Sequence, residues 1–242
     1  MNLTDANAKR LFLLTSPPVV EYWCGLRVVR DDMLPGGTKS RAIHLLFDSE
    51  HEEYVYAGPC QGYAQVALAY ACSYHGKRAT LFVAKRKGMH SRTAKAVATG
   101  ANVIEVPHGY LSNVRSKAEL YCRDSGALIL PFGLEDPRMI SGIAEAARQI
   151  PIEPTEVWSV AGSGTLSLAL QEAWPAAVVN AVMIGKQHES IGRAKLWVAP
   201  ESYKQPAKHP PPFPSCDNYD AKLWQFVMQY ASPGALVWNV AS

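Results

Sequence analysis

Short apolar segments alternate with longer, helix-like segments from residue 53 to residue 184. The short segments are rich in β-branched and aromatic residues, as in ATLFVA at 79–84 and NVIEV at 102–106, a pattern typical of buried strands. Because single helices separate successive strands, we expect parallel strands joined by right-handed crossovers, in an α/β fold. The predicted strands cover 54–57, 79–84, 102–106, 127–131, 156–160 and 177–184, and the predicted helices cover 61–76, 91–99, 112–124, 138–150 and 165–174.

The C-terminal sixth of the chain has a different pattern. The segment 202–216 contains five prolines, three of them consecutive at 210–212, and is expected to form an extended loop. A last helix over 220–231 and a last strand over 235–240 follow it.

Composition and charge narrow the class of protein. Of the 242 residues 48% are hydrophobic and 19% are charged, which favours a folded chain of one or two domains. The net charge of +3 is too small to indicate a nucleic-acid partner by itself. No uncharged apolar run reaches the ~18 residues of a membrane span, and the polar N-terminus does not resemble a secretory leader, so no membrane partner is expected. The five cysteines (24, 60, 72, 122 and 216) form no CxxC pair, and the seven histidines form no HExxH motif, so we expect a cytoplasmic protein without disulfides or a metal site.

Lys39 is the first candidate for chemistry. It follows the turn Pro35-Gly36-Gly37 at the start of a predicted helix, with Thr38 as the expected N-cap. The positive end of a helix dipole opposes a protonated lysine, so the pKa of this amine is expected to be lowered. Such an amine is suited to Schiff-base formation. The alternative is a solvated surface lysine.

The second candidate is the turn Gly162-Ser163-Gly164-Thr165, between a predicted strand and a predicted helix. Glycines allow close approach of a ligand to the backbone, and free amides at a helix start bind anions, so this turn is a candidate phosphate site. It lacks the Lys-Ser/Thr ending of a P-loop and the acidic ribose ligand of a dinucleotide site. The alternative is an ordinary tight strand-to-helix turn.

A third strand-to-helix turn contains Cys60-Gln61-Gly62-Tyr63, where Gln61 and Tyr63 offer polar groups. Taken alone, this segment is equally compatible with a simple turn. In a parallel sheet, however, the turns that follow the strands converge at the carboxyl edge, where ligands bind. A lysine, a phosphate-binding turn and a polar turn at one edge suit a phosphorylated aldehyde cofactor.

Together these segments resemble the fold-type II family of pyridoxal-phosphate enzymes, which includes the tryptophan synthase β-subunit, threonine synthase and serine dehydratase. The resemblance extends from about residue 28 to the C-terminus and depends on the order and spacing of the segments. Tyr219-Asp220-Ala221-Lys222 and the closing LVWNVAS are similar to the aminocyclopropane carboxylate deaminase and D-cysteine desulfhydrase branch. The other matching segments are 30–41, 58–62, 131–150 and 162–165.

The resemblance implies a two-lobed parallel-sheet sandwich of the tryptophan synthase β-like type. Residues 1–44 and 136–242 would form the larger lobe, and 45–135 a smaller inserted lobe. It also implies pyridoxal 5'-phosphate as cofactor, a homodimer, and a role for each candidate residue. Lys39 would hold the cofactor as a Schiff base and move the α-proton of the substrate. The phosphate would lie on Gly162, Ser163, Gly164 and Thr165, Gln61 would contact the cofactor, and the substrate would meet Cys60, Gln61, Gly62 and Tyr63.

The chain departs from the family pattern in several places. Gln61 and Tyr63 replace the usual Asn of the carboxylate turn, and the phosphate turn is one glycine shorter than the commonest form. The acid-bearing helix before the closing strand is expected to be replaced by KHPPPFPSCDN at 208–218, and Val240 stands where Thr is common. The remaining candidates to face the pyridine nitrogen are Cys216, Asn239 and Ser242.

The resulting hypothesis is a pyridoxal-phosphate lyase or deaminase acting on an amino acid or amine. One alternative keeps the cofactor but takes an amino-acid group attached to a nucleotide or DNA, by elimination or decarboxylation. Its support is a basic cluster near one strand, the alternative being a solvated edge. A further alternative is a non-catalytic relative that binds a phosphate ligand; phosphoribosyl transfer is disfavoured because no acid pair is present. The basic cluster comprises Lys77, Arg78, Lys85, Arg86, Lys87, His90 and Arg92.

Overall fold

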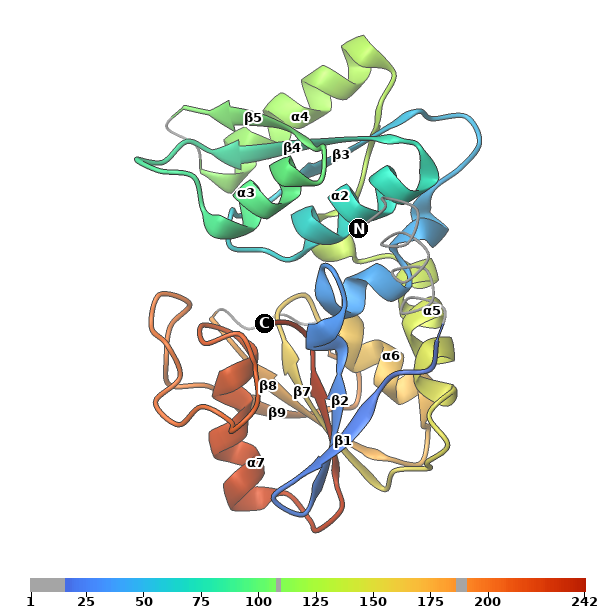
Figure 1. Ribbon diagram of the computed structural model, residues 1–242, viewed down its shortest axis with the longest axis vertical. Coiled ribbons are helices and arrows are strands. Elements are labelled where there is room, and N and C mark those ends of the chain that lie inside the picture. Colours follow the sequence, from blue (N-terminus) through green and yellow to red (C-terminus); the bar gives the residue numbers. More distant parts are fainter. Residues whose placement is uncertain (1–15, 108–109, 186–190) are drawn as a thin grey trace, which may run out of the picture.

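Two sheets build two lobes in the computed structural model, which describes residues 16–107, 110–185 and 191–242 (Figure 1). One sheet has four strands in the order β5-β4-β3-β6, and the other has six in the order β1-β2-β10-β7-β8-β9. Every pair of neighbouring strands is parallel except β1 and β2. The predicted α/β, two-lobed, parallel-sheet architecture is therefore confirmed, while the limits of the lobes at 44/45 and 135/136 stay a prediction.

The four-stranded lobe is covered by helices on both faces of its sheet (Figure 1). Alternate residues of one strand face opposite helices: Val55 packs with Val114 of α4, whereas Tyr54 packs in the same cluster as Leu68 of α2. This two-sided burial is the reason why its strands are continuously apolar. The elements are β3 (Glu53–Ala57), α2 (Ala64–His75), β4 (Arg78–Ala84), α3 (Ser91–Ala98), β5 (Asn102–Val106), α4 (Leu111–Ser125) and β6 (Leu128–Ile129).

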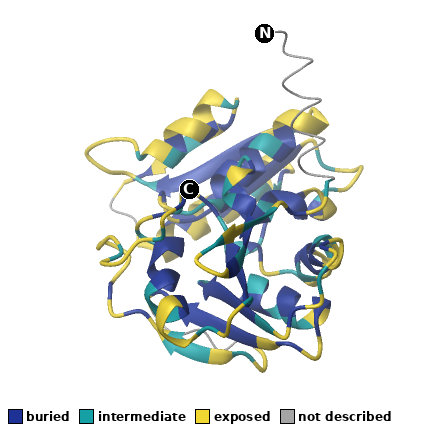
Figure 2. Ribbon diagram, turned by 60° about the horizontal axis from the view of Figure 1, so that its bottom comes forward, coloured by how far each residue is buried: buried dark blue, intermediate teal, exposed yellow. Residues whose placement is uncertain are grey.

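The six-stranded lobe has the same three-layer construction, with α5 and α6 on one face and α7 on the other (Figure 1). Figure 2 shows that the strands of the sheets are largely buried and that exposed residues lie mainly on surface helices and loops. The elements are β1 (Val20–Trp23), β2 (Leu26–Arg30), α5 (Pro137–Arg148), β7 (Glu156–Ala161), α6 (Thr165–Ala173), β8 (Val178–Met183), β9 (Lys195–Val198), η5 (Asp220–Leu223), α7 (Trp224–Tyr230) and β10 (Leu236–Asn239).

Most of the predicted strands and helices are confirmed within a few residues, but the segment after Gly37 is not the predicted helix with Thr38 as N-cap. It forms two short 3-10 helices, η2 (Gly37–Arg41) and η3 (Ile43–Leu46), and the N-cap is Gly36 at φ +85°. Thr38 instead uses its hydroxyl to accept a hydrogen bond from Trp238. Strands β1, β2 and β9 were also not predicted.

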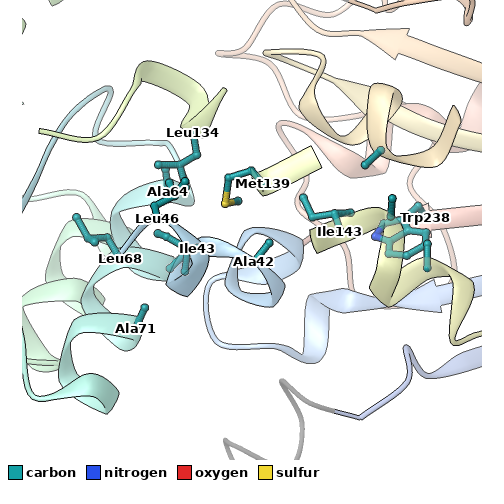
Figure 3. Packing of buried hydrophobic residues seen from close by; sticks show 14 of the residues in the cluster. Ala42, Ile43, Leu46, Ala64, Leu68, Ala71, Leu134, Met139, Ile143 and Trp238 are labelled. Carbon is teal, nitrogen blue, oxygen red and sulfur yellow. The ribbon is translucent and has the colours of Figure 1, made fainter. Parts of the chain in front are cut away.

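The two 3-10 helices join the lobes through apolar packing (Figure 3). Ile43 and Leu46 lie beside Leu68 of α2, and Ala42 lies between them and α5, where Met139 is buried. Segments from both lobes thus share one core at the place where the candidate lysine is found.

A buried polar network fixes the start of this segment. The indole nitrogen of Trp238 on β10 donates to Asp31 Oδ2 at 3.0 Å and to Thr38 Oγ1 at 2.9 Å. The Arg41 guanidinium donates to Asp31 Oδ1 at 2.8 and 2.6 Å. Asp31 is fully buried, so its carboxylate depends on these donors in place of water.

The described residues contain neither a helix that could span a membrane nor a cluster of metal-binding side chains. None of the helices in these ranges is long and apolar enough to cross a membrane. No group of three or more His, Cys, Asp or Glu side chains in the described part of the chain is arranged to hold a metal ion.

We expect Asp31→Ala to destabilise the protein by about 3–5 kcal/mol, because it leaves the Arg41 guanidinium buried without its partner. Urea unfolding measures the loss. The exposed Asp124, changed to Ala, is the matched control and should alter stability by no more than about 0.5 kcal/mol. Equal, small effects of the two substitutions would contradict the prediction.

Candidate active site

Lys39 lies in η2, half-buried between the lobes. Its Nζ donates a hydrogen bond of 2.7 Å to the carbonyl oxygen of Gly133. Burial lowers the pKa of the amine from 10.5 to about 8, and the negative charge of Glu135 opposes this shift. The expectation of a lowered pKa is met, but the cause is loss of water and not an α-helix dipole. A freely solvated surface lysine is excluded.

The predicted phosphate turn lies beside this amine. It connects β7 to α6, and Gly164 at φ +87° is the N-cap of α6. Ser163 Oγ is 3.0 Å from Thr165 Oγ1 and 3.5 Å from Gly133 O, the same carbonyl that Lys39 binds. One peptide oxygen therefore connects the lysine to a turn of hydroxyls and helix-start amides, which is an arrangement suited to an anion.

Close backbone approach explains the glycine at 133. A Cβ there would lie 2.6 Å from Ser163 Cβ, so no larger residue fits between the lysine and the turn. Gly133 also has φ +69°, a conformation that side chains disfavour. Its amide N–H donates a hydrogen bond of 3.4 Å to the hydroxyl oxygen of Tyr56.

The turn at 60–63 is held by Gln65, a buried residue to which the sequence analysis gave no role. The buried Gln65 donates from Nε2 to the carbonyl oxygens of Cys60 and Gly62, and its Oε1 accepts from Thr93. Cys60 is buried and Gln61 is exposed. No hydrogen bond described here joins the Gln61 side chain to Lys39 or to 162–165, so its contact with a cofactor stays a prediction.

Two tyrosines missed by the sequence analysis face the phosphate turn. The rings of Tyr203 and Tyr219 stack with centroids 6.1 Å apart and an interplanar angle of 9°. A Cβ on Gly162 would lie 2.8 Å from the Tyr219 hydroxyl oxygen and 3.5 Å from that of Tyr203. The pair therefore lies against Gly162, and only glycine leaves room for it.

Asp220 is a buried carboxyl group with spare bonding capacity. Its Oδ1 accepts from the amide of Val240 at 3.1 Å, and its Oδ2 has no hydrogen-bond partner among the described residues. Burial raises the pKa of this carboxyl to about 8. The signal that could have identified it was the Tyr219-Asp220-Ala221-Lys222 segment itself.

The three residues suggested earlier for the pyridine nitrogen are occupied elsewhere. Asn239 accepts from Ser215 and donates to Pro214 O, Ser242 donates to Asp32 O, and Cys216 accepts from Arg92. Asp220 is the better candidate because one of its oxygens is free.

Lys222 fixes the backbone next to the two tyrosines. It is fully buried, and its Nζ donates to Ser202 O at 2.8 Å and to Asn218 O at 2.7 Å. These carbonyls directly precede Tyr203 and Tyr219 in the sequence. One ammonium group thus closes both ends of the proline-rich segment that carries the pair.

A hollow of about 320 Å³ lies away from this site, between β5 and α4, and includes Phe82 and Tyr121 in its lining. A much smaller one, of about 10 Å³, reaches Asp220 and Asn239 from the side of Trp224.

Comparison with known proteins identifies the fold. No family model and no curated protein matches the chain. Among solved structures, an ACC deaminase homologue has a TM-score of 0.75 and 14% identity, covering 95% of this chain and 90% of the other. Threonine deaminase isoform 2 from Solanum lycopersicum has a TM-score of 0.70 and 12% identity, covering 99% and 85%. Serine racemase from Dictyostelium discoideum has a TM-score of 0.68 and 14% identity, covering 98% and 96%.

At this level of identity the likeness establishes the fold alone. The chain has the tryptophan synthase β-like fold of the fold-type II enzymes, as the resemblance of its segments implied.

Lys39→Met should stabilise the protein at pH 7 by about 2 kcal/mol. The variant no longer has a buried charge, and this gain exceeds the free energy lost with the hydrogen bond to Gly133. The folded pKa lies below the unfolded one, so between about pH 8 and 10.5 the unfolded chain binds more protons. Wild-type stability therefore rises with pH across this window, and the advantage of the variant disappears. Urea unfolding at pH 7 and 10.5 measures this. An advantage that is unchanged at the higher pH would show that charge burial is not the cause.

Lys222→Met should release the segment 202–218, because the two carbonyls that its ammonium binds lose their donor. Limited trypsin digestion should then cut after Lys204 and Lys208 several-fold faster than in the wild type. The exposed Lys117→Met is the control, since it also removes one lysine, and it should leave the rates of cutting after Lys204 and Lys208 unchanged. Equal digestion rates would show that other contacts hold the segment.

Proposed function

We propose that this protein is a pyridoxal-phosphate-dependent lyase or deaminase acting on an amino acid or amine, with Lys39 as the residue that binds the cofactor. The observation that carries the proposal is the shared carbonyl of Gly133. It brings a half-buried amine of lowered pKa next to a hydroxyl-bearing turn at a helix start. The deaminases and the diaminopropionate ammonia lyase among the similar structures support this class of reaction.

The residues present fit the three ends of pyridoxal phosphate. The primary amine of Lys39 suits the aldehyde, and the turn Gly162–Thr165 suits the phosphate through backbone amides and the hydroxyls of Ser163 and Thr165. The free Oδ2 of Asp220 suits the pyridine nitrogen. A buried carboxyl with an unpaired oxygen is costly, and a ring N–H partner would satisfy it.

When bound, pyridoxal phosphate supplies an aldehyde that condenses with an amine and a pyridine ring that accepts the electron pair of a bond broken at the adjacent carbon. The reaction also needs a proton acceptor close to that carbon, and Lys39 Nζ would take this role. With a pKa of about 8, about a tenth of this amine is neutral at pH 7, far more than for an exposed lysine. Tyr203 and Tyr219 lie against Gly162 at the start of the phosphate turn and limit the space there.

The turn Cys60-Gln61-Gly62-Tyr63 is proposed to bind the substrate carboxylate. Gln65 and Thr93 brace it from the buried side, so its conformation is set before a ligand arrives. The homodimer and the cytoplasmic location are part of the same proposal.

The basic cluster divides into two parts, which weakens the alternative of a substrate attached to DNA. Lys77 pairs with Glu52, and Arg78 pairs with Glu53, at the start of β4. The rest of the cluster follows the other end of that strand: the exposed run 85–87, then His90 and the half-buried Arg92. This short group offers too few cations for a long polyanion.

Purified protein mixed with pyridoxal phosphate should become yellow, with a visible absorption band that moves when a suitable amino acid is added. Lys39→Ala should abolish the band, because it removes the amine that binds the aldehyde. The exposed Lys95→Ala is the control and should keep it. A wild-type protein that stays colourless in excess cofactor would refute the proposal and favour a non-catalytic phosphate-binding protein.

A further inference from the structure

Arg92 is a cation of the four-stranded lobe that reaches the other lobe. It is the second residue of α3, and it donates from Nη1 to Gln61 O and from Nη2 to Cys216 Sγ. Its guanidinium carbon lies 3.8 Å from the centroid of the Tyr63 ring. The side chain thus stands between the predicted substrate turn and the C-terminal segment.

This guanidinium has no acidic partner within the described ranges, in contrast to Arg30 and Arg41 at the carboxyl end of β2. Arg30 pairs with Asp32 and Glu21, and Arg41 pairs with Asp31. Arg92 is half-buried and forms no ion pair with any described carboxylate. Of its five N–H donors, the described contacts use two, so three remain for a ligand.

The position of Cys216 connects Arg92 to the rest of the site. The carbonyl oxygen of Cys216 accepts from the amides of Tyr219 and Ala221, on either side of Asp220. The positive charge of Arg92 lowers the pKa of Asp220, although burial outweighs it. Arg92 is therefore within electrostatic reach of the carboxyl proposed to face the cofactor.

Tyr63 holds the guanidinium through a cation–π contact that uses none of its N–H groups. The guanidinium carbon lies over the ring, so the N–H donors that do not bind Gln61 and Cys216 stay available. A planar guanidinium binds carboxylate or phosphate oxygens through two parallel hydrogen bonds. Positive charge from the exposed run 85–87, whose Arg86 acts together with Arg92 on His90, adds to the attraction for an anion.

We infer that Arg92 binds an anionic group on the substrate side chain, so that the preferred substrate is an amino acid with a second acid group, a carboxylate or a phosphate. The inference rests on the proposed function, which assigns the α-carboxylate to the turn at 60–63. Arg92 then acts as the residue that determines specificity for the far end of the substrate.

The test is an equilibrium titration of the cofactor-loaded protein with matched ligand pairs, followed by the visible spectrum. The pairs are aspartate and asparagine, glutamate and glutamine, and O-phosphoserine and serine. In the wild type the acidic member of at least one pair should bind roughly tenfold or more tightly than its neutral partner. Arg92→Gln should reduce this ratio to about one, and Arg92→Lys should keep part of it because the charge remains.

Arg115→Gln is the matched control, since Arg115 is exposed and pairs only with Glu119 on α4. It should leave the ratio unchanged. The inference is overturned if coloured wild-type protein binds acidic and neutral ligands equally, or if Arg92→Gln weakens both members of a pair by the same factor. The second result would mean that Arg92 serves the α-carboxylate or only supports the turn. A wild type that never becomes coloured would instead refute the proposed function, and this inference with it.

Discussion

The hydrogen bonds from the Trp238 indole to Asp31 and Thr38 are the interaction on which the site depends. They connect the last strand, β10, to the turn that presents Lys39, across 200 residues of sequence. The same carboxylate binds Arg41 at the end of η2, while Trp238 binds Thr38 near its start, so one buried network holds both ends of this short helix. A five-residue 3-10 helix has little stability of its own, and the network supplies what local propensity does not.

Close backbone contacts determine where the functional groups meet. Gly37 approaches Val240 O so closely that a Cβ would lie 2.3 Å from it, and Gly133 and Gly162 approach Ser163 and Tyr219 in the same manner. Each of these glycines lies where two segments distant in sequence converge. Because these glycines have no side chain, the segments can approach each other closely, and the polar groups of the site are concentrated in a small volume.

The sequence predicted the parallel architecture because it depends on a local pattern, and local patterns also singled out Lys39 and the turn 162–165, which the structure brings together at Gly133 O. Apolar strands alternating with helices predict crossovers, and a glycine-rich turn before a helix predicts an anion site. The tyrosine pair and Asp220 depend on tertiary contacts instead. Asp220 becomes notable only when its oxygen is seen to lack a partner, and Tyr203 only when the Lys222 ammonium brings it to Tyr219. The expected cap at Thr38 was wrong for the same reason, because its hydroxyl binds Trp238 from the opposite end of the chain.

Strand β10 lies in the interior of its sheet, with β2 on one side and β7 on the other. During synthesis, residues 27–30 and 157–159 leave the ribosome long before 236–239, and until then the two strands have no neighbour between them. The nascent chain can complete the four-stranded lobe early, since that lobe uses only residues 53–129. In the larger lobe, the edges of β2 and β7 that pair with β10 stay unpaired until then, and chaperones or other unfolded chains can bind to them. The sheet of the larger lobe therefore reaches its native topology only after β10 has been synthesised and has paired with both β2 and β7.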